Sequence, residues 1–267
     1  MADITAKDVQ ALRQATGAGI LDARKALVEC DGDFNKATDW LREKGLAGAA
    51  KREDRDRSEG AVAAYIAPDG KVAALCSLEC ETDFVAKSED FMNLVAKISE
   101  EVAKNGEDVA SAFEADIDNL KVVLKENIGL GKTVRFEAQP DSILGHYLHT
   151  QNNRGVNAVL VEISGGTEEL AHDVAVHIAF GKPKYLNKED VPSDLVDKER
   201  ETIEKISRNE GKPEAALPKI VEGRLNTWYK DLVLMEQPYV KDDKKQISEL
   251  LQGAKILRFA QILVGSE

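Results

Sequence analysis

The stretch VAAYIAPDGKVAALCSLEC (residues 62–80) decides how the middle of this 267-residue chain folds. It holds two apolar runs separated by Pro68-Asp69-Gly70, and such turn residues between apolar runs predict a β-hairpin. A helical pattern of apolar residues follows the hairpin at i, i+3, i+4, i+7 and i+11. The members of this stripe are Phe91, Leu94, Val95, Ile98 and Val102. The sequence therefore predicts a strand–turn–strand–helix unit.

A second stretch repeats this order further along the chain. ILGHYLH (residues 143–149) is followed by the turn residues 152–155, by VNAVLVEI (residues 156–163) and by another helical stripe. That stripe contains Leu170, Val174, His177 and Ile178, and the matching positions are Tyr65 with Tyr147, Gly70 with Gly155 and Glu79 with Glu162. A helix carrying Leu120, Val123, Leu124 and Ile128 lies between the two stretches. Two related α+β units are the simplest explanation of this internal repeat.

Residues 1 to about 45 predict three short helices that form a small bundle. Thr5 is a good N-cap with Asp8 three positions later, and Gly17-Ala18-Gly19 ends the first helix. The third helix is expected to stop at Gly45. KREDRDRSEG (residues 51–60) has no apolar residue and both charge signs, so we expect an exposed linker and a domain boundary there.

Residues 194–234 predict an antiparallel helical hairpin. The break at residues 211–214 and Pro218, which suits the first turn of a helix, separate two narrow apolar stripes. The stripes are Val196, Ile203 and Ile206, then Leu217, Val221, Leu225, Trp228 and Leu232. The expected domains are residues 1–50, a linker 51–59, a first α+β unit 60–140, a second α+β unit 141–193 with 235–267, and the hairpin 194–234.

Composition narrows the function classes. The formal net charge of −12 argues against nucleic acid as the main ligand, because duplex binding usually needs a basic face, and it suits a protein that meets another protein. Apolar runs are too short to span a bilayer, and the N-terminus shows no signal or transit peptide, so we expect no membrane and a cytoplasmic protein.

Motifs of catalysis and metal binding give no local support for an enzyme. His146 and His149 are expected on opposite faces of a strand, and His172 and His177 lie about 140° apart on a helix, so neither pair is suited to hold a metal. Cys76 and Cys80 share one face of a strand and are interpreted as core residues rather than as a metal or redox pair. We expect no catalytic residue, no metal and no cofactor.

GLGKT (residues 129–133) looks like the end of a phosphate-binding loop. The full pattern needs a further glycine five positions before Gly131, where Glu126 stands, and a carboxylate there repels phosphate. We interpret the segment as a helix-to-strand connection and expect no direct nucleotide binding.

The segment ETDFVAK (residues 81–87) follows the second strand of the first hairpin. Thr82 or Asp83 is suited to cap a helical turn, which places Phe84 near the start of that turn. Two interpretations remain open from the residues alone. Phe84 either packs into the core, which composition favours, or projects from the turn.

Several segments together resemble the elongation factor Ts family. TDFVA (residues 82–86) matches its signature, and LRQATGAGILDARKAL (residues 12–27) is similar to its first motif. GDFNKATDWLREKG (residues 32–45), HIAFGKP (residues 177–183), GKPE (residues 211–214) and IVEGR (residues 220–224) continue the similarity in order. The resemblance covers nearly the whole chain.

This resemblance implies a fold and a partner. The fold is α+β, with an N-terminal ubiquitin-associated-like bundle, a core of two related repeats and a protruding helical hairpin. The partner is elongation factor Tu, bound in its GDP-loaded and nucleotide-free states, and the activity is guanine-nucleotide exchange without covalent chemistry. One chain already holds both repeats, so we expect a one-to-one heterodimer with the GTPase, or two such pairs associating.

The resemblance also assigns roles to residues. The segment that enters the partner near its nucleotide consists of Thr82, Asp83, Phe84 and Val85. Phe84 wedges between partner side chains, and Asp83 helps to hold that arrangement. As a result the magnesium ion and GDP leave the partner. Arg13, Ile20 and Leu21 are expected to contact the nucleotide-binding domain, and His149 and His177 to lie on the surface that meets a more distant partner domain.

Two alternatives compete with this interpretation. The bundle could make the chain a general adaptor, which binding to ubiquitin would favour, or distant residues could assemble an enzyme site. The sequence also departs from the family pattern. Ile20-Leu21 stands where methionines are common. The sequence ends at Glu267 with LRFAQILVGSE (residues 257–267), where some members continue with a further helix.

Overall fold

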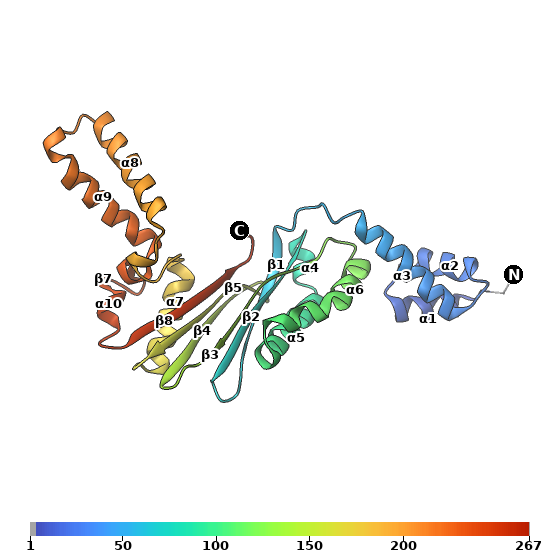
Figure 1. The fold of residues 1–267 in the computed structure, drawn as a ribbon. Coiled ribbons are helices and arrows are strands. Elements are labelled where there is room, and N and C mark those ends of the chain that lie inside the picture. The colour runs from blue at the N-terminus through green and yellow to red at the C-terminus, as the bar shows by residue number, and fades with distance from the viewer. Residues whose placement is uncertain (1–3, 267) are drawn as a thin grey trace.

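The computed structural model describes residues 4–266, which combine helices and strands in an α+β fold, as predicted. Figure 1 shows an elongated molecule with a helical bundle at the N-terminal end, two sheets in the middle and a helical hairpin at the opposite end.

The N-terminal bundle consists of α1 (Ala6–Thr16), α2 (Ile20–Glu29) and α3 (Phe34–Ala50). Thr5 caps α1 in a capping box with Asp8, and Gly17 ends the helix in the left-handed conformation with φ of 67°, as the sequence predicted. The buried side chains of the bundle are Val9, Leu12, Ala23, Ala26, Leu27, Ala37 and Leu41.

The prediction that the third helix stops at Gly45 is wrong, since α3 continues to Ala50. Gly45 lies against α6 (Glu114–Leu124), where an added Cβ would stand 2.4 Å from Val122 Cγ1. This glycine therefore allows a close approach of two helices, and the helix-forming residues after it carry α3 onward.

The charged segment after α3 is exposed, as expected, but it is tied to the first sheet unit. Arg52 Nη2 donates to the carbonyl of Lys121 at 3.0 Å, and Arg55 pairs with Glu81 at 3.2 Å. Glu59, at its end, already belongs to a strand and pairs with Arg154 at 2.7 Å.

The first sheet has the order β1-β2-β3 and is antiparallel, with β1 (Glu59–Ile66), β2 (Val72–Cys80) and β3 (Gly129–Glu137). The hairpin of β1 and β2 and the helix after it, α5 (Glu89–Asn105), were predicted. Every member of the predicted stripe on α5 is buried against the sheet. The predicted stripe on α6 is only partly right. Ile128 lies beyond the end of the helix, and Val123 is exposed, with its side chain near Gly17 of the bundle.

The second sheet has the order β4-β5-β8, with β4 (Ser142–Gln151), β5 (Arg154–Ser164) and β8 (Lys255–Leu263). α7 (Glu168–Gly181) follows β5 and covers one face of this sheet. Asn152 and Asn153 make the turn between β4 and β5 with φ of 52° and 64°, a pair of left-handed residues typical of a tight hairpin.

The predicted match of Gly70 with Gly155 does not hold in the structure. Gly70 is a turn residue with φ of 68°, whereas Gly155 lies inside β5. A Cβ on Gly155 would stand 2.1 Å from the carbonyl oxygen of Val62, so this glycine allows β1 and β5 to approach each other.

The two sheets pack face to face, and helices cover their outer faces, so the core has four layers (Figure 1). Leu75 of β2 and Leu160 of β5 are among the buried residues between the sheets. Arg258 joins the sheets at one side: its Nε donates to the buried Glu162 at 2.6 Å and its Nη2 to the carbonyl of Glu137 at 2.8 Å.

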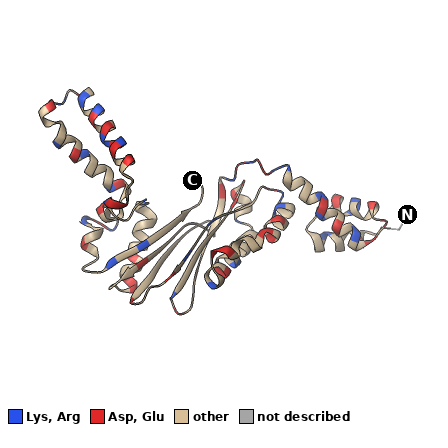
Figure 2. Ribbon diagram, viewed as in Figure 1, with Lys and Arg blue, Asp and Glu red and all other residues tan. Residues whose placement is uncertain are grey.

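The helical hairpin consists of α8 (Ser193–Asn209) and α9 (Leu217–Leu232), as predicted. Ile203, Val221 and Leu225 form its small core, while Ile206 of the predicted stripe is exposed. Acidic and basic residues are interspersed along both helices (Figure 2). No helix within residues 4–266 is long and apolar enough to cross a membrane.

Short elements complete the chain. They are α4 (Asp83–Ala86), α10 (Ile247–Leu250), β6 (Pro238–Tyr239), β7 (Asp242–Gln246) and the 3-10 helices η1 (Glu107–Phe113), η2 (Lys188–Asp190), η3 (Glu214–Ala216) and η4 (Leu234–Glu236).

Candidate functional site

The segment predicted to carry the function forms a single helical turn at the end of β2. Thr82 adopts the extended conformation and caps α4, and its Oγ1 accepts a hydrogen bond from Val85 N at 3.4 Å. Ala86 is buried and Val85 packs against the core of the first unit. The turn is therefore anchored on its inner side.

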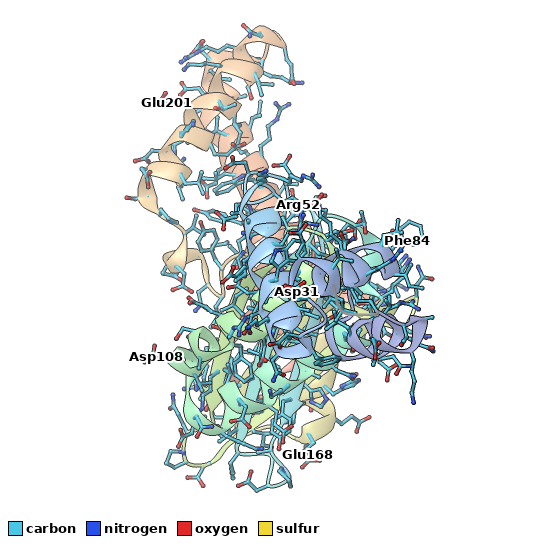
Figure 3. All side chains as sticks on the ribbon, turned by 90° about the vertical axis from the view of Figure 1, so that its right-hand side faces the viewer. Asp31, Arg52, Phe84, Asp108, Glu168 and Glu201 are labelled. Atoms are coloured by element: carbon cyan, nitrogen blue, oxygen red, sulfur yellow. The ribbon has the colours of Figure 1, made fainter. Side chains whose placement is uncertain are left out.

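Phe84 points away from this anchor. With 82% of its surface exposed, it is the most exposed large apolar side chain in residues 4–266, and Figure 3 labels it at the rim of the molecule. Of the two open interpretations, the core position that composition favoured is wrong. Covering an exposed phenyl ring with another protein removes apolar surface from water and so favours binding.

Charged groups flank this ring. Asp83 pairs with Lys87, whose Nζ lies 5.9 Å from the centroid of the Phe84 ring. The hydrogen bond from Lys87 is the main reason that the pKa of the Asp83 carboxyl is lowered. Asp83 is therefore ionised at neutral pH beside the exposed ring.

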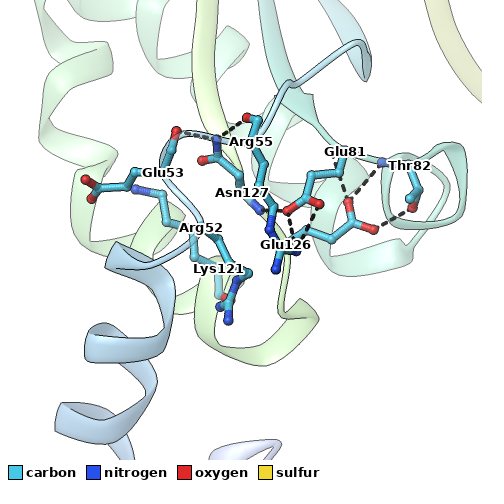
Figure 4. Close-up of polar contacts among 8 residues, drawn as sticks. All are labelled: Arg52, Glu53, Arg55, Glu81, Thr82, Lys121, Glu126 and Asn127. Atoms are coloured by element: carbon cyan, nitrogen blue, oxygen red, sulfur yellow. Dashed lines mark hydrogen bonds and ion pairs between the residues drawn. The ribbon is translucent and has the colours of Figure 1, made fainter.

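A carboxylate from a distant part of the sequence holds the start of the turn (Figure 4). Glu126 Oε2 accepts hydrogen bonds from the backbone N–H groups of Glu81 and Thr82, both at 3.0 Å. Its Oε1 accepts from Thr82 Oγ1 at 2.5 Å. In the sequence Glu126 served only as evidence against a phosphate loop, and a partner 44 positions away leaves no local signal.

Asn127 fastens the linker to the same place. Its side-chain amide donates to the carbonyls of Glu53 at 2.9 Å and Arg55 at 2.7 Å, and its backbone N–H donates to Glu81 at 2.7 Å. Desolvation raises the pKa of Glu81, but the bonds from Asn127 and Arg55 outweigh it, so that pKa is lowered. Sequence reasoning missed Asn127 as well.

The apolar residues expected to contact a partner from the bundle are exposed. Ile20 and Leu21 occupy the first turn of α2 and are 57% and 79% exposed, and Arg13 on α1 is also exposed. They belong to the bundle, whereas Phe84 belongs to the first sheet unit, so these candidate contacts lie on separate parts of the chain.

The two histidines expected on a more distant surface differ from each other. His149 is exposed on β4, where its ring lies 6.3 Å from Tyr147 and 6.1 Å from Phe180, centroid to centroid. His177 does not lie on the surface: it is 1% exposed, and its ring bonds to Gln237 at 2.9 Å and to Val240 N at 3.2 Å. The surface prediction for His177 is therefore wrong, because α7 turns this residue toward the interior.

The segment at residues 129–133 lies in β3 itself rather than in a connection before it. Its glycines make room for side chains: a Cβ on Gly129 would stand 1.9 Å from Arg57 Nη1, and one on Gly131 2.4 Å from Ser77 Oγ. This arrangement is a paired strand and not a loop that surrounds a phosphate.

The two cysteines predicted to be core residues lie in the core. Cys76 and Cys80 are buried in the first unit, and burial raises the pKa of each thiol to about 12. Within the described residues 4–266, no three His, Cys, Asp or Glu side chains are grouped so that they could hold a metal ion.

Comparisons with known proteins place this geometry in a family. A family model described as "Elongation factor TS" matches residues 81–266, beginning at the capped turn. Curated proteins named "Elongation factor Ts" from Streptomyces avermitilis and Streptomyces coelicolor are each 45% identical over 277 residues, covering 99% of this chain and 100% of their own length. One from Renibacterium salmoninarum is 43% identical over 281 residues and covers both chains fully. With such identity along the whole length, bundle included, the chain belongs to the elongation factor Ts family of translation elongation factors.

Proposed function

We propose that this chain binds elongation factor Tu in its GDP-bound state, promotes the loss of magnesium and GDP, and so allows GTP to load. The observation that carries the proposal is Phe84, an apolar ring kept in water on a capped and braced turn. Membership in the elongation factor Ts family supports the choice of partner.

The proposed action is thermodynamic coupling. Thr82, Asp83, Phe84 and Val85 enter the partner near its nucleotide site, and the ring of Phe84 separates partner side chains there. A factor that prefers the nucleotide-free partner weakens the binding of GDP to that partner. By the same coupling free energy, GDP weakens the binding of the factor. Burial of a Phe side chain contributes roughly 1.5–3 kcal/mol, and each ~1.4 kcal/mol is a factor of ten in affinity.

Exchange of this kind makes and breaks no covalent bond. The chain then needs no catalytic acid, base or nucleophile and no cofactor of its own, and it acts in the cytoplasm, where its partner works. Arg13, Ile20 and Leu21 supply a second contact with the nucleotide-binding domain, and His149 a third with a more distant domain. His177 is left out of these contacts because it is buried.

The proposal includes the domain division into residues 1–50, 51–59, 60–140, 141–193 with 235–267, and 194–234. We assign the bundle to the ubiquitin-associated-like type and the two sheet units to related repeats. Their arrangement supports this: each unit begins with a hairpin, continues with a helix, and adds its third strand beside the second strand of the hairpin.

The test is release of a fluorescent GDP analogue from elongation factor Tu, with this chain in catalytic amounts. We expect marked acceleration. The Phe84→Ala variant should lose roughly 10- to 150-fold of the exchange efficiency, the factor that corresponds to the burial of the ring. Its melting temperature should stay unchanged, because the ring contributes little to the core.

Leu195→Ala on the distal α8 is the matched control, since Leu195 is also a large apolar residue on the surface. It should exchange nucleotide like the unchanged chain. If the unchanged chain fails to accelerate release from an active GTPase, the exchange proposal is wrong; if only Phe84→Ala has no effect, the wedge is wrong.

A further inference from the structure

Two neighbouring residues after α6 hold two segments that are distant from each other in sequence. Glu126 binds the start of the Thr82–Val85 turn, and Asn127 binds the linker at Glu53 and Arg55 (Figure 4). We call residues 126–127 the junction. Neither residue belongs to a helix or a strand.

The bonds of the Glu126 carboxylate all end on Thr82, the cap of α4, and on Glu81 just before it. Both of its oxygens are used, by two backbone N–H groups and one hydroxyl. Hydrogen bonds to an ionised acceptor are shorter and stronger than neutral ones. This carboxylate therefore fixes the backbone at Glu81 and Thr82 and also the rotamer of the Thr82 side chain.

A helix as short as α4 depends on such support. It has four residues, and a single helical turn is not stable by itself in water. Thr82 Oγ1, which Glu126 holds, in turn accepts from Val85 N and closes the turn. The direction of the Phe84 ring thus depends on a carboxylate that does not touch the ring.

We propose that Glu126 is a positioning residue for nucleotide exchange, which keeps Phe84 aimed outward before the partner arrives. Ordering a loop during binding has a free-energy cost, and a loop ordered beforehand avoids it. Asn127 fastens the linker that follows the bundle to the same junction. The two regions expected to contact the partner, the bundle and the Thr82–Val85 turn, are therefore both attached to this junction. This inference rests on the proposed function.

The first measurement needs no partner. Amide hydrogen exchange of the free chain should become at least about tenfold faster at Glu81, Thr82 and Val85 in Glu126→Ala, the factor that corresponds to ~1.4 kcal/mol. Amides of β2 should be unchanged. Glu126→Gln should stay near the unchanged chain, because its amide oxygen still accepts from both N–H groups and its amino group can donate to Thr82 Oγ1.

The second measurement is GDP release at increasing concentrations of the chain. The maximal rate with Glu126→Ala should fall about tenfold, and Glu126→Gln should restore most of it. The double variant Phe84→Ala/Glu126→Ala should be no slower than Phe84→Ala, since Glu126 acts only through the ring. Glu107→Ala is the matched control: Glu107 also accepts from a backbone N–H, that of Arg135 at 2.8 Å, but far from the turn.

The outcomes separate the two proposals. If Phe84→Ala slows release while Glu126→Ala does not, or if the two losses add, Glu126 has no positioning role. If Phe84→Ala has no effect, the wedge proposal fails, and the amide measurement alone decides whether Glu126 orders the turn. Should Glu126→Ala lose its cooperative melting transition, Thr82→Val replaces it. This variant removes both bonds of the hydroxyl, the one to Glu126 and the one from Val85 N, and leaves the backbone bonds to Glu126 in place. An unchanged release rate would overturn the inference.

Discussion

Leu21 is an apolar side chain that the bundle leaves in water. It lies in the first turn of α2 beside Ile20 and is 79% exposed, whereas residues further along the helix are buried in the core of the bundle. Residues that bind a partner equally before and during nucleotide release affect the concentration needed and not the maximal rate. Phe84 and Leu21 should therefore differ in their kinetic signatures.

Leu21→Ala should raise the half-saturating concentration of the chain in GDP release by up to roughly 30-fold, which corresponds to ~2 kcal/mol of lost burial, with little change in the maximal rate. Val28→Ala, an exposed residue at the other end of α2, serves as the control and should behave like the unchanged chain. A lower maximal rate with an unchanged half-saturating concentration would assign Leu21 to the exchange step instead.

His177 should make stability depend on pH. Burial lowers its pKa, although the bond to Gln237 opposes this, so the folded chain binds a proton less readily than the unfolded chain. The neutral ring donates from Nε2 to Gln237 and accepts at Nδ1 from Val240 N, and a second ring proton would face that N–H. The contribution of His177 to the free energy of unfolding is therefore fully present above the ordinary pKa of 6.5. It falls as the pH drops below that value, by at most ~1.4 kcal/mol per pH unit.

Thermal unfolding between about pH 7.5 and about pH 5.5 measures this effect, because most carboxylates titrate at lower pH. His177→Gln should flatten the dependence. A residual slope of the same sign is expected from His146, whose pKa is lowered by burial and by His172. An identical slope in both chains would show that His177 does not carry it.

His177 and Phe84 show what single residues reveal before a structure is known. The stripe of Leu170, Val174 and Ile178 placed His177 on the apolar face of α7, which is where it lies, while the resemblance to the family suggested a surface position. Periodicity reports burial directly, whereas a family motif reports only that a residue type recurs. For Phe84 the local sequence favoured the core, because nothing nearby encodes the Glu126 contact that orients the turn.

At the scale of elements, the close contact of α3 with α6 sets how the bundle sits on the first unit. Gly45→Ala should not gain the ~1 kcal/mol that helix propensity offers, because the new Cβ would meet Val122 at 2.4 Å. Gly48→Ala is a matched variant in the same helix, where the nearest atom, Arg52 Nη1, lies at 3.5 Å. It should raise stability by roughly 0.5–1 kcal/mol.

Thermal unfolding of both variants, with proteolysis of the linker at residues 51–58, tests this contact. Gly45→Ala should be cleaved faster than the unchanged chain, because separation of α3 from α6 strains the bond between Arg52 and Lys121. Equal stabilisation by both substitutions would mean that α3 and α6 do not pack this closely in solution.

Elements whose causes are local were predicted well. The hairpin turns, the Thr5 cap and the first turn of α9, which contains Pro218, depend on neighbouring residues. The end of α3 was not predicted, because a glycine can either end a helix or admit a neighbouring helix, and Val122 is far away in sequence. The stacking of the two sheets was not predicted either, although β2 is buried on both faces, with Leu75 toward the second sheet and Cys76 toward the helices.

At the scale of the whole molecule, one chain supplies both sheets and covers their shared apolar face. Nothing in that interface calls for a second copy, so we expect one chain for each elongation factor Tu in a nucleotide-free mixture, measured by light scattering after size-exclusion chromatography. Excess GDP with magnesium should separate the complex, as reciprocal coupling requires. A mass of two chains and two partners would indicate associated pairs, and a complex unaffected by GDP would contradict the coupling.

Strand β8 completes the second sheet beside β5, and the hairpin of α8 and α9 lies between β5 and β8 in the chain. During synthesis on a ribosome, the bundle and the first sheet can therefore fold while β5 still shows a free edge. An unpaired apolar edge invites pairing with other nascent chains. A factor that serves translation thus depends, for its own second half, on a strand that is made only after the inserted helical hairpin.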